Sequence, residues 1–227
     1  MEKDNRIYFK GNPYSKGHRI KKFIWSGRLD ANEQLWFDFH LETDDYYSED
    51  DDEEDDKEDS DWEAKSVWEN YHSCTLSSTK WKSQGIEIDT TNRKFDFDSL
   101  LLNDLTVDTL PLEDDLDFDD LSFHIYLLGH DSCAGHRIKF SKNNTDSFDI
   151  EWSGKIALTY GGEDEFKHDF SAFIQDVTFD GFYLPKNFGI EKAKKVFDNK
   201  LNNIENFEFV DLNPKSNKRE YKLCQRK

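Results

Sequence analysis

The chain has 227 residues, and its 49 acidic side chains against 30 basic ones leave a formal net charge of −19 at neutral pH. This balance argues against direct nucleic-acid binding, because binding to phosphates depends on clustered Lys and Arg. Aromatic residues make up 15% of the chain, and disordered chains are poor in aromatics, so we expect a folded core.

The first residues, MEKDNRIYF, are polar and lack the apolar core of a signal peptide. No apolar run approaches the roughly 20 residues that a membrane-spanning helix needs. We therefore expect a cytoplasmic protein that makes no membrane contact. Three widely spaced cysteines, Cys74, Cys133 and Cys224, fit reduced thiols in that compartment.

A β-hairpin is predicted early in the chain, where apolar and polar residues alternate. Phe23 and Trp25 precede a turn at residues 30–33, and apolar residues then recur at every second position from Leu35 to Leu41. A period of two is typical of a half-buried strand.

Acidic residues are concentrated directly after this hairpin, from Asp44 to Asp61. The segment holds thirteen Asp or Glu and one Lys, a local charge of −12 that leaves −7 for the other 209 residues. Like charges at this density favour a solvated loop. The alternative is a surface that contacts a partner, with tryptophans as aromatic anchors, although burial in the core competes as an explanation of the tryptophans. The residues assigned to partner binding are Asp50, Asp51, Asp52, Glu53, Glu54, Asp55, Asp56, Trp62 and Trp68.

A possible metal site lies at His130-x-x-Cys133-x-x-His136, which with His72-x-Cys74 would offer imidazole and thiolate ligands for zinc. The spacing matches no established zinc module, and the Gly- and Ser-containing segment is typical of a loop. We expect loop histidines here, with no bound metal and no cofactor. Further strands are predicted at residues 66–76, 85–89, 122–128, 177–184 and 207–212.

Two parts of the chain resemble each other, which indicates an internal duplication unless short strings coincide by chance. In the second part, residues 150–160 alternate, a turn follows at 161–164, and residues 166–174 return, so a second hairpin is predicted. The matched strings, in the same order in both parts, are Arg6 to Asn12 with Arg137 to Asn143, Trp25 to Leu29 with Trp152 to Ile156, and Asp38-Phe39 with Asp169-Phe170.

Helical spacing is clear in one segment, Ile190 to Leu201, which also carries Glu191 in its first turn. The predicted fold class is mostly β, with duplicated antiparallel β-sandwich-like units and one C-terminal helix, and a single α+β domain is the alternative. The first unit covers residues 1–112 and carries the acidic insert at 44–61. The second covers 121–213, and a basic tail follows at 214–227.

One arrangement resembles the core of metal-dependent nucleases, in which acids hold Mg²⁺ and a lysine steadies the attacking water. It consists of Asp149 on one predicted strand and Glu165-x-Lys167 on the next. The equivalent positions of the first part are Gln34 and Trp36, and we find no basic groove for phosphates in the sequence. The solvent face of a hairpin is the better explanation, and no catalytic residue is predicted.

The function expected from charge and class is that of a non-enzymatic protein that binds or inhibits a basic partner protein. A dense array of carboxylates attracts a cationic surface and mimics a row of phosphates. An immunity protein for a toxin or an anti-defence inhibitor would work in this way. The alternatives are a metal-dependent enzyme, either nuclease-like or with a zinc site, and a structural or accessory protein.

Overall fold

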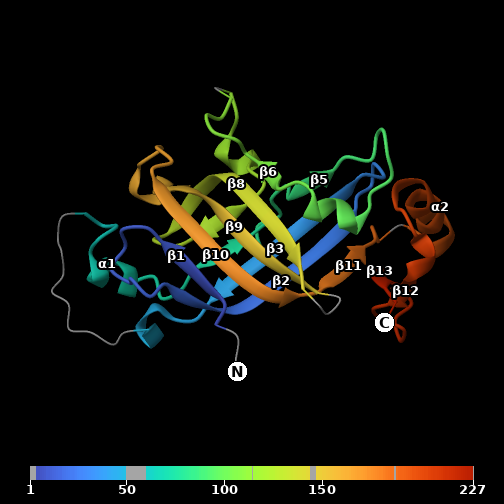
Figure 1. Ribbon diagram of the computed structural model, residues 1–227, viewed down its shortest axis with the longest axis horizontal. Helices are drawn as coiled ribbons and strands as arrows, with labels where there is room; N and C mark the ends of the chain where they lie inside the picture. Colours follow the sequence, from blue (N-terminus) through green and yellow to red (C-terminus); the bar gives the residue numbers. More distant parts are fainter. Residues whose placement is uncertain (1–3, 50–59, 114, 144–146, 187, 227) are drawn as a thin grey trace.

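The computed structural model describes residues 4–49, 60–113, 115–143, 147–186 and 188–226, and its centre is a closed antiparallel barrel (Figure 1). The eight strands of the barrel are β1 (Arg6–Phe9), β2 (His18–Leu29), β3 (Leu35–Thr43), β4 (Thr75–Ser77), β7 (His124–Tyr126), β8 (His130–Lys142), β9 (Phe148–Ala157) and β10 (His168–Val177). They pair in the order β2-β1-β10-β9-β8-β7-β4-β3, and β3 pairs with β2 to complete the ring.

Other strands extend this sheet outside the ring. They are β5 (Ile86–Ile88), β6 (Leu105–Val107), β11 (Phe179–Tyr183), β12 (Phe207–Asp211) and β13 (Tyr221–Gln225). β11 runs parallel to the end of β2, and β13 and then β12 continue from it, whereas β5 pairs with β3 and β6 pairs with β8.

Two α-helices, α1 (Lys65–Glu69) and α2 (Ile190–Lys200), lie at opposite ends of the molecule (Figure 1). α2 buries Ala193, Val196 and Phe197, and since Val196 and Phe197 follow Ala193 by three and four residues, all three share one face. The Phe197 ring packs against Phe182 of β11 at 5.7 Å and against Phe209 of β12 at 6.3 Å. The helix thus covers the part of the sheet that extends beyond the barrel.

Aromatic side chains fill the interior, because alternate residues of each barrel strand point inward. Trp25 is fully buried and its ring lies 4.8 Å from Phe140 and 5.5 Å from Phe37. Trp152, on the opposite wall, lies 4.9 Å from Phe123. The high aromatic content of the chain is therefore that of a packed core.

Both predicted hairpins are present, as β2–β3 and β9–β10. Each matched Trp-Ser-Gly string lies on the first strand of its hairpin, and the basic residue after it pairs with the matched aspartate on the second strand. Arg28 reaches Asp38 diagonally, whereas Lys155 stands directly opposite Asp169. The two hairpins thus differ in register by two residues, but each places an ion pair between a basic residue and an aspartate on the outer face.

The mostly β class and the C-terminal helix are confirmed. The strands of the two matched parts, however, do not form separate sandwich-like layers, because β1 lies between β2 and β10 and joins both parts in one ring. The predicted basic tail contains β13. Lys222 of this strand pairs with Asp180, and Arg219, just before it, pairs with Asp211. The strand predicted at residues 66–76 is helical over α1 and extended only from Thr75.

Candidate functional site

The acidic segment leaves the barrel and returns to it at one aromatic cluster. Tyr46, near its start, is fully buried, and Trp62, just after its end, is 4% exposed. The rings of both lie 5.3 Å from the ring of Trp68 on α1. The assigned residues Asp50, Asp51, Asp52, Glu53, Glu54, Asp55 and Asp56 lie outside the described residues.

The structure places Trp62 and Trp68 in the core, which corrects their assignment as partner anchors. The Trp62 indole donates to the Lys10 carbonyl at 3.0 Å, and the Trp68 indole donates to the Trp62 carbonyl at 2.8 Å. The Trp68 ring also stacks on the buried His18 ring at 5.7 Å. Because both indoles are buried with their N–H groups satisfied, they fasten the segment that follows the acidic run to the barrel.

The His and Cys residues that suggested zinc are spread over the inside and outside of the barrel wall. Cys74 and Cys133 are fully buried, and burial raises the pKa of both thiols, so neither is a thiolate. His72 and His130 are exposed instead. Within the described parts of the chain, no group of three or more His, Cys, Asp or Glu is placed to hold a metal ion.

The nuclease-like residues lie at opposite ends of the β9–β10 ladder. Asp149 stands at the end where Ile150 pairs with Ile174, and it accepts a hydrogen bond from the backbone N–H of Asp176. Glu165 and Lys167 precede the other end, about 20 Å away at the rise of a β-strand. Lys167 is also paired with Glu163. The three residues therefore do not form a common site.

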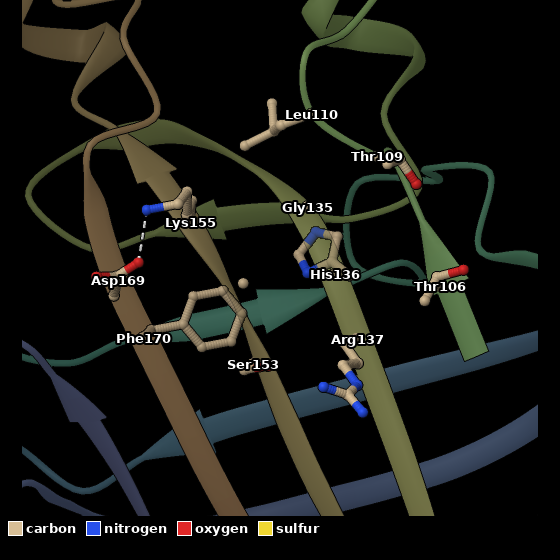
Figure 2. Close-up of a pocket in the computed structure, with 11 residues that line it drawn as sticks. Thr106, Thr109, Leu110, Gly135, His136, Arg137, Ser153, Lys155, Asp169 and Phe170 are labelled. Carbon is tan, nitrogen blue, oxygen red and sulfur yellow. Dashed lines mark hydrogen bonds and ion pairs between the residues drawn. The ribbon is translucent and has the colours of Figure 1, made fainter. Parts of the chain in front are cut away.

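The structure instead offers a groove on the outer wall of the barrel, with a volume of about 530 Å³ (Figure 2). Its floor is the outer face of β8, β9 and β10, and one wall is β6 with the loop after it. The lining residues are Thr106, Thr109, Leu110, Gly135, His136, Arg137, Ser153, Gly154, Lys155, Asp169 and Phe170. Its size falls within the range of small-molecule pockets.

A bulge in β8 shapes the wall of this groove. Pairing with β9 shifts register between Ala134 and Arg137, and Gly135 adopts a φ of 63° there. The Gly135 N–H donates to the Asp108 carbonyl at 2.6 Å, which holds the loop after β6 over the bulge. A Cβ atom at Gly135 would lie 3.1 Å from Leu110, so glycine lets the loop approach closely.

The charged residues of the groove are paired, but they remain open to solvent. Lys155 donates to Asp169 at 2.6 Å, and their side chains are 41% and 44% exposed. The hydrogen bond from Lys155 lowers the pKa of the Asp169 carboxyl. Arg137 forms an ion pair with Asp104 beside β6. The groove thus presents cations and a carboxylate at its rim.

His136 lies under the groove and is a structural residue. Its side chain is fully buried, and burial lowers its pKa to about 3, so the ring is neutral. Its Nδ1 accepts from the Trp152 indole at 3.3 Å, which leaves Nε2 to donate to the Cys133 carbonyl at 3.3 Å. Since both ring nitrogens are engaged inside the wall, His136 is not an exposed acid or base.

Sequence reasoning missed this groove, although one signal pointed to it. The matched strings single out Lys155 and Asp169 as the counterparts of Arg28 and Asp38. The wall residues Thr109 and Leu110 lie in a loop whose position depends on the pairing of β6 with β8, which no local pattern reveals.

Comparison of the chain with protein-family models, with curated proteins and with solved structures finds no match in any of the three. Across the described residues, no helix has the length and apolar character needed to cross a membrane.

Proposed function

We propose that this protein is a non-enzymatic binding protein that presents carboxylates to a basic partner protein in the cytoplasm. Inhibition is the role that suits it best, as in an immunity protein for a toxin or an anti-defence inhibitor. The charge of the segment from Asp44 to Asp61 carries this proposal, because it concentrates −12 of the total −19 in eighteen residues.

The way the chain is held at the two ends of this segment supports the proposal. Tyr46 and Trp62 are buried and both contact Trp68, so the chain leaves and re-enters the barrel at one place. The described residues at the two ends of the acidic segment are therefore held together on a packed scaffold. A local field of one sign speeds the encounter with a basic surface, and salt screens it.

The test begins with capture of partners on the purified protein from its native host and elution in high salt. The affinity of the identified partner is then measured for two variants with equal changes in charge. One replaces Asp51, Asp52, Glu53 and Asp55 by their amides. The control neutralises one Glu and three Asp outside the acidic segment, all exposed: Glu113, Asp115, Asp119 and Asp120.

The acidic-segment variant should weaken binding by tenfold or more at low salt, which corresponds to about 1.4 kcal/mol. The control should change it much less, and the difference should shrink as salt is added. Equal effects of the two variants would show that only net charge matters. A partner that binds the acidic-segment variant as tightly as the native protein would refute the proposal.

A further inference from the structure

The two matched hairpins carry the same ion pair on the outer face of the barrel, but only one of the pairs is covered. In the first hairpin Arg28 pairs with Asp38, whose side chain is 5% exposed. In the second, Lys155 pairs with Asp169, whose side chain is 44% exposed. The first pair is therefore covered by other residues of the chain, and the second pair lacks such a cover.

A segment of the chain itself, Ser77 to Gly85, covers the pair in the first hairpin. The Ser78 hydroxyl donates to Asp38 at 2.8 Å, and Arg28 donates to the backbone carbonyl of Gln84. Gly85 follows so closely that a Cβ atom there would lie 2.8 Å from Asp38. One hydroxyl and one backbone carbonyl thus satisfy the carboxylate and the cation together.

The second pair stands at the groove described above. Asp169 pairs with Lys155 and also with Lys10, at 3.7 Å. Lys155 carries three N–H donors and Asp169 four acceptor positions, so both keep hydrogen-bonding capacity toward the groove. Leu110, which is partly exposed, supplies apolar surface beside them (Figure 2), whereas Phe170 is only 2% exposed.

We propose that this groove binds a looped polypeptide segment of a partner protein, in the manner in which Ser77 to Gly85, which turns at residues 78–82, binds the first pair. A backbone carbonyl of the segment accepts from Lys155, as the Gln84 carbonyl accepts from Arg28. A Ser or Thr hydroxyl donates to Asp169, as Ser78 donates to Asp38. The contacts with the bound segment are polar at Lys155 and Asp169 and apolar at Leu110.

This site is separate from the acidic segment but lies beside its C-terminal flank. The His168 ring, next to Asp169 on β10, stacks on Trp62 at 3.8 Å. Lys10 contacts both sides, since its carbonyl accepts from Trp62 and its side chain pairs with Asp169. A single partner that meets the acidic segment can therefore also place a looped segment in the groove.

The probe that tests the inference is a synthetic peptide with the sequence of residues 77–85, blocked at both ends. In the peptide Lys80→Gln and Lys82→Gln remove its positive charge, so that the acidic segment does not attract it. It is titrated into the ¹⁵N-labelled full chain, and amide shifts are followed. A matched peptide that also carries Ser78→Ala reports on the hydroxyl.

Shifts should cluster at Ser153, Lys155 and Asp169, and Lys155→Met or Asp169→Asn should weaken binding by about tenfold, the scale of a hydrogen bond to a charged group. The control Lys139→Met, an exposed residue paired with Glu151 outside the groove, should leave the affinity unchanged. The Ser78→Ala peptide should bind more weakly than its parent. Because the groove pair is half exposed, these variants should stay folded.

The inference is overturned if the peptide produces no shifts, if its shifts lie away from the groove, or if the groove variants bind as the native chain does. Inorganic phosphate is titrated in parallel, and groove shifts with phosphate but not with the peptide would identify an anion site instead. None of these outcomes depends on Asp50 to Asp59, so failure here leaves the proposed function standing.

Discussion

Removal of the carboxylate from the two matched ion pairs should have very different costs. The perturbations are Asp38→Ala and Asp169→Ala. Asp38 is buried and holds both Arg28 and the Ser78 hydroxyl, so its loss leaves a cation and a buried hydroxyl without their partner. Breaking a buried pair costs about 3–5 kcal/mol. Because the Arg28 side chain is 31% exposed, water compensates part of this, and we expect about 2–3 kcal/mol.

The matched pair at the groove is screened by solvent. Lys155 and Asp169 are each more than 40% exposed, and exposed pairs contribute about 0.2–1 kcal/mol. At about 2–4 °C per kcal/mol for a chain of this length, Asp38→Ala should lower the Tm by roughly 4–12 °C and Asp169→Ala by less than about 4 °C. Urea unfolding followed by tryptophan fluorescence provides the free energies. Equal losses in the two variants would refute the reasoning from burial.

Two further perturbations test the packed wall of the barrel. Burial lowers the pKa of His18 and of His136 to about 3 from an ordinary 6.5. Below about pH 6.5 the unfolded chain therefore binds more protons than the folded one. The free energy of unfolding then falls as pH drops toward 3, by up to about 1.4 kcal/mol per pH unit for each ring. His18→Phe should remove one ring's share of this slope in urea unfolding between pH 4 and 7, and an unchanged slope would contradict burial of a neutral ring. Gly154→Ala should cost about 1–3 kcal/mol, because its Cβ atom would lie 2.7 Å from Phe170 and 2.9 Å from His136. Gly161→Ala, where a Cβ atom meets nothing within 4 Å, should change stability by less than about 0.5 kcal/mol in the same assay, and a similar loss in both would count against the close contact.

Local periodicity was sufficient to predict the hairpins and the long helix. Alternation from Leu35 to Leu41 and from Ile150 to Trp152 identifies the side chains that face the core, and this is a property of neighbouring residues, whereas the burial of Asp38 and His40 between them is not. The same logic failed over residues 66–76. There Trp68 is buried by contact with Trp62 and Tyr46. Tertiary packing therefore stabilises a short helix where a β-strand was predicted.

Closure of the barrel could not be predicted in this way. β1 pairs with β2 and with β10, and the partners in the second case are more than 160 residues apart, as for Arg6 and Phe173. β7 likewise joins β8 to β4 through three residues. Such short strands leave little periodic signal, and their pairing is decided by where the longer hairpins bring their edges.

For the candidate site, too, the sequence predicted some features and the structure was needed for others. The sequence alone located the acidic run and the matched Trp-Ser-Gly strings, since charge and repetition are properties of the chain itself. It could not decide that Trp62 is buried, nor that Asp149 and Glu165 stand at opposite ends of one ladder. Exposure and separation depend on contacts between distant residues.

The sequence by itself determined that this protein is strongly acidic, mostly β and internally matched, and that −12 of its charge lies between Asp44 and Asp61. Only the tertiary structure decided that both matched parts share one ring of strands and that the aromatic residues beside the acidic run fasten it to the core. It also decided that one matched ion pair is covered by the chain while the other faces an open groove. The physical reason is that burial is a collective property, because a side chain loses contact with water only when segments far apart in the sequence pack around it.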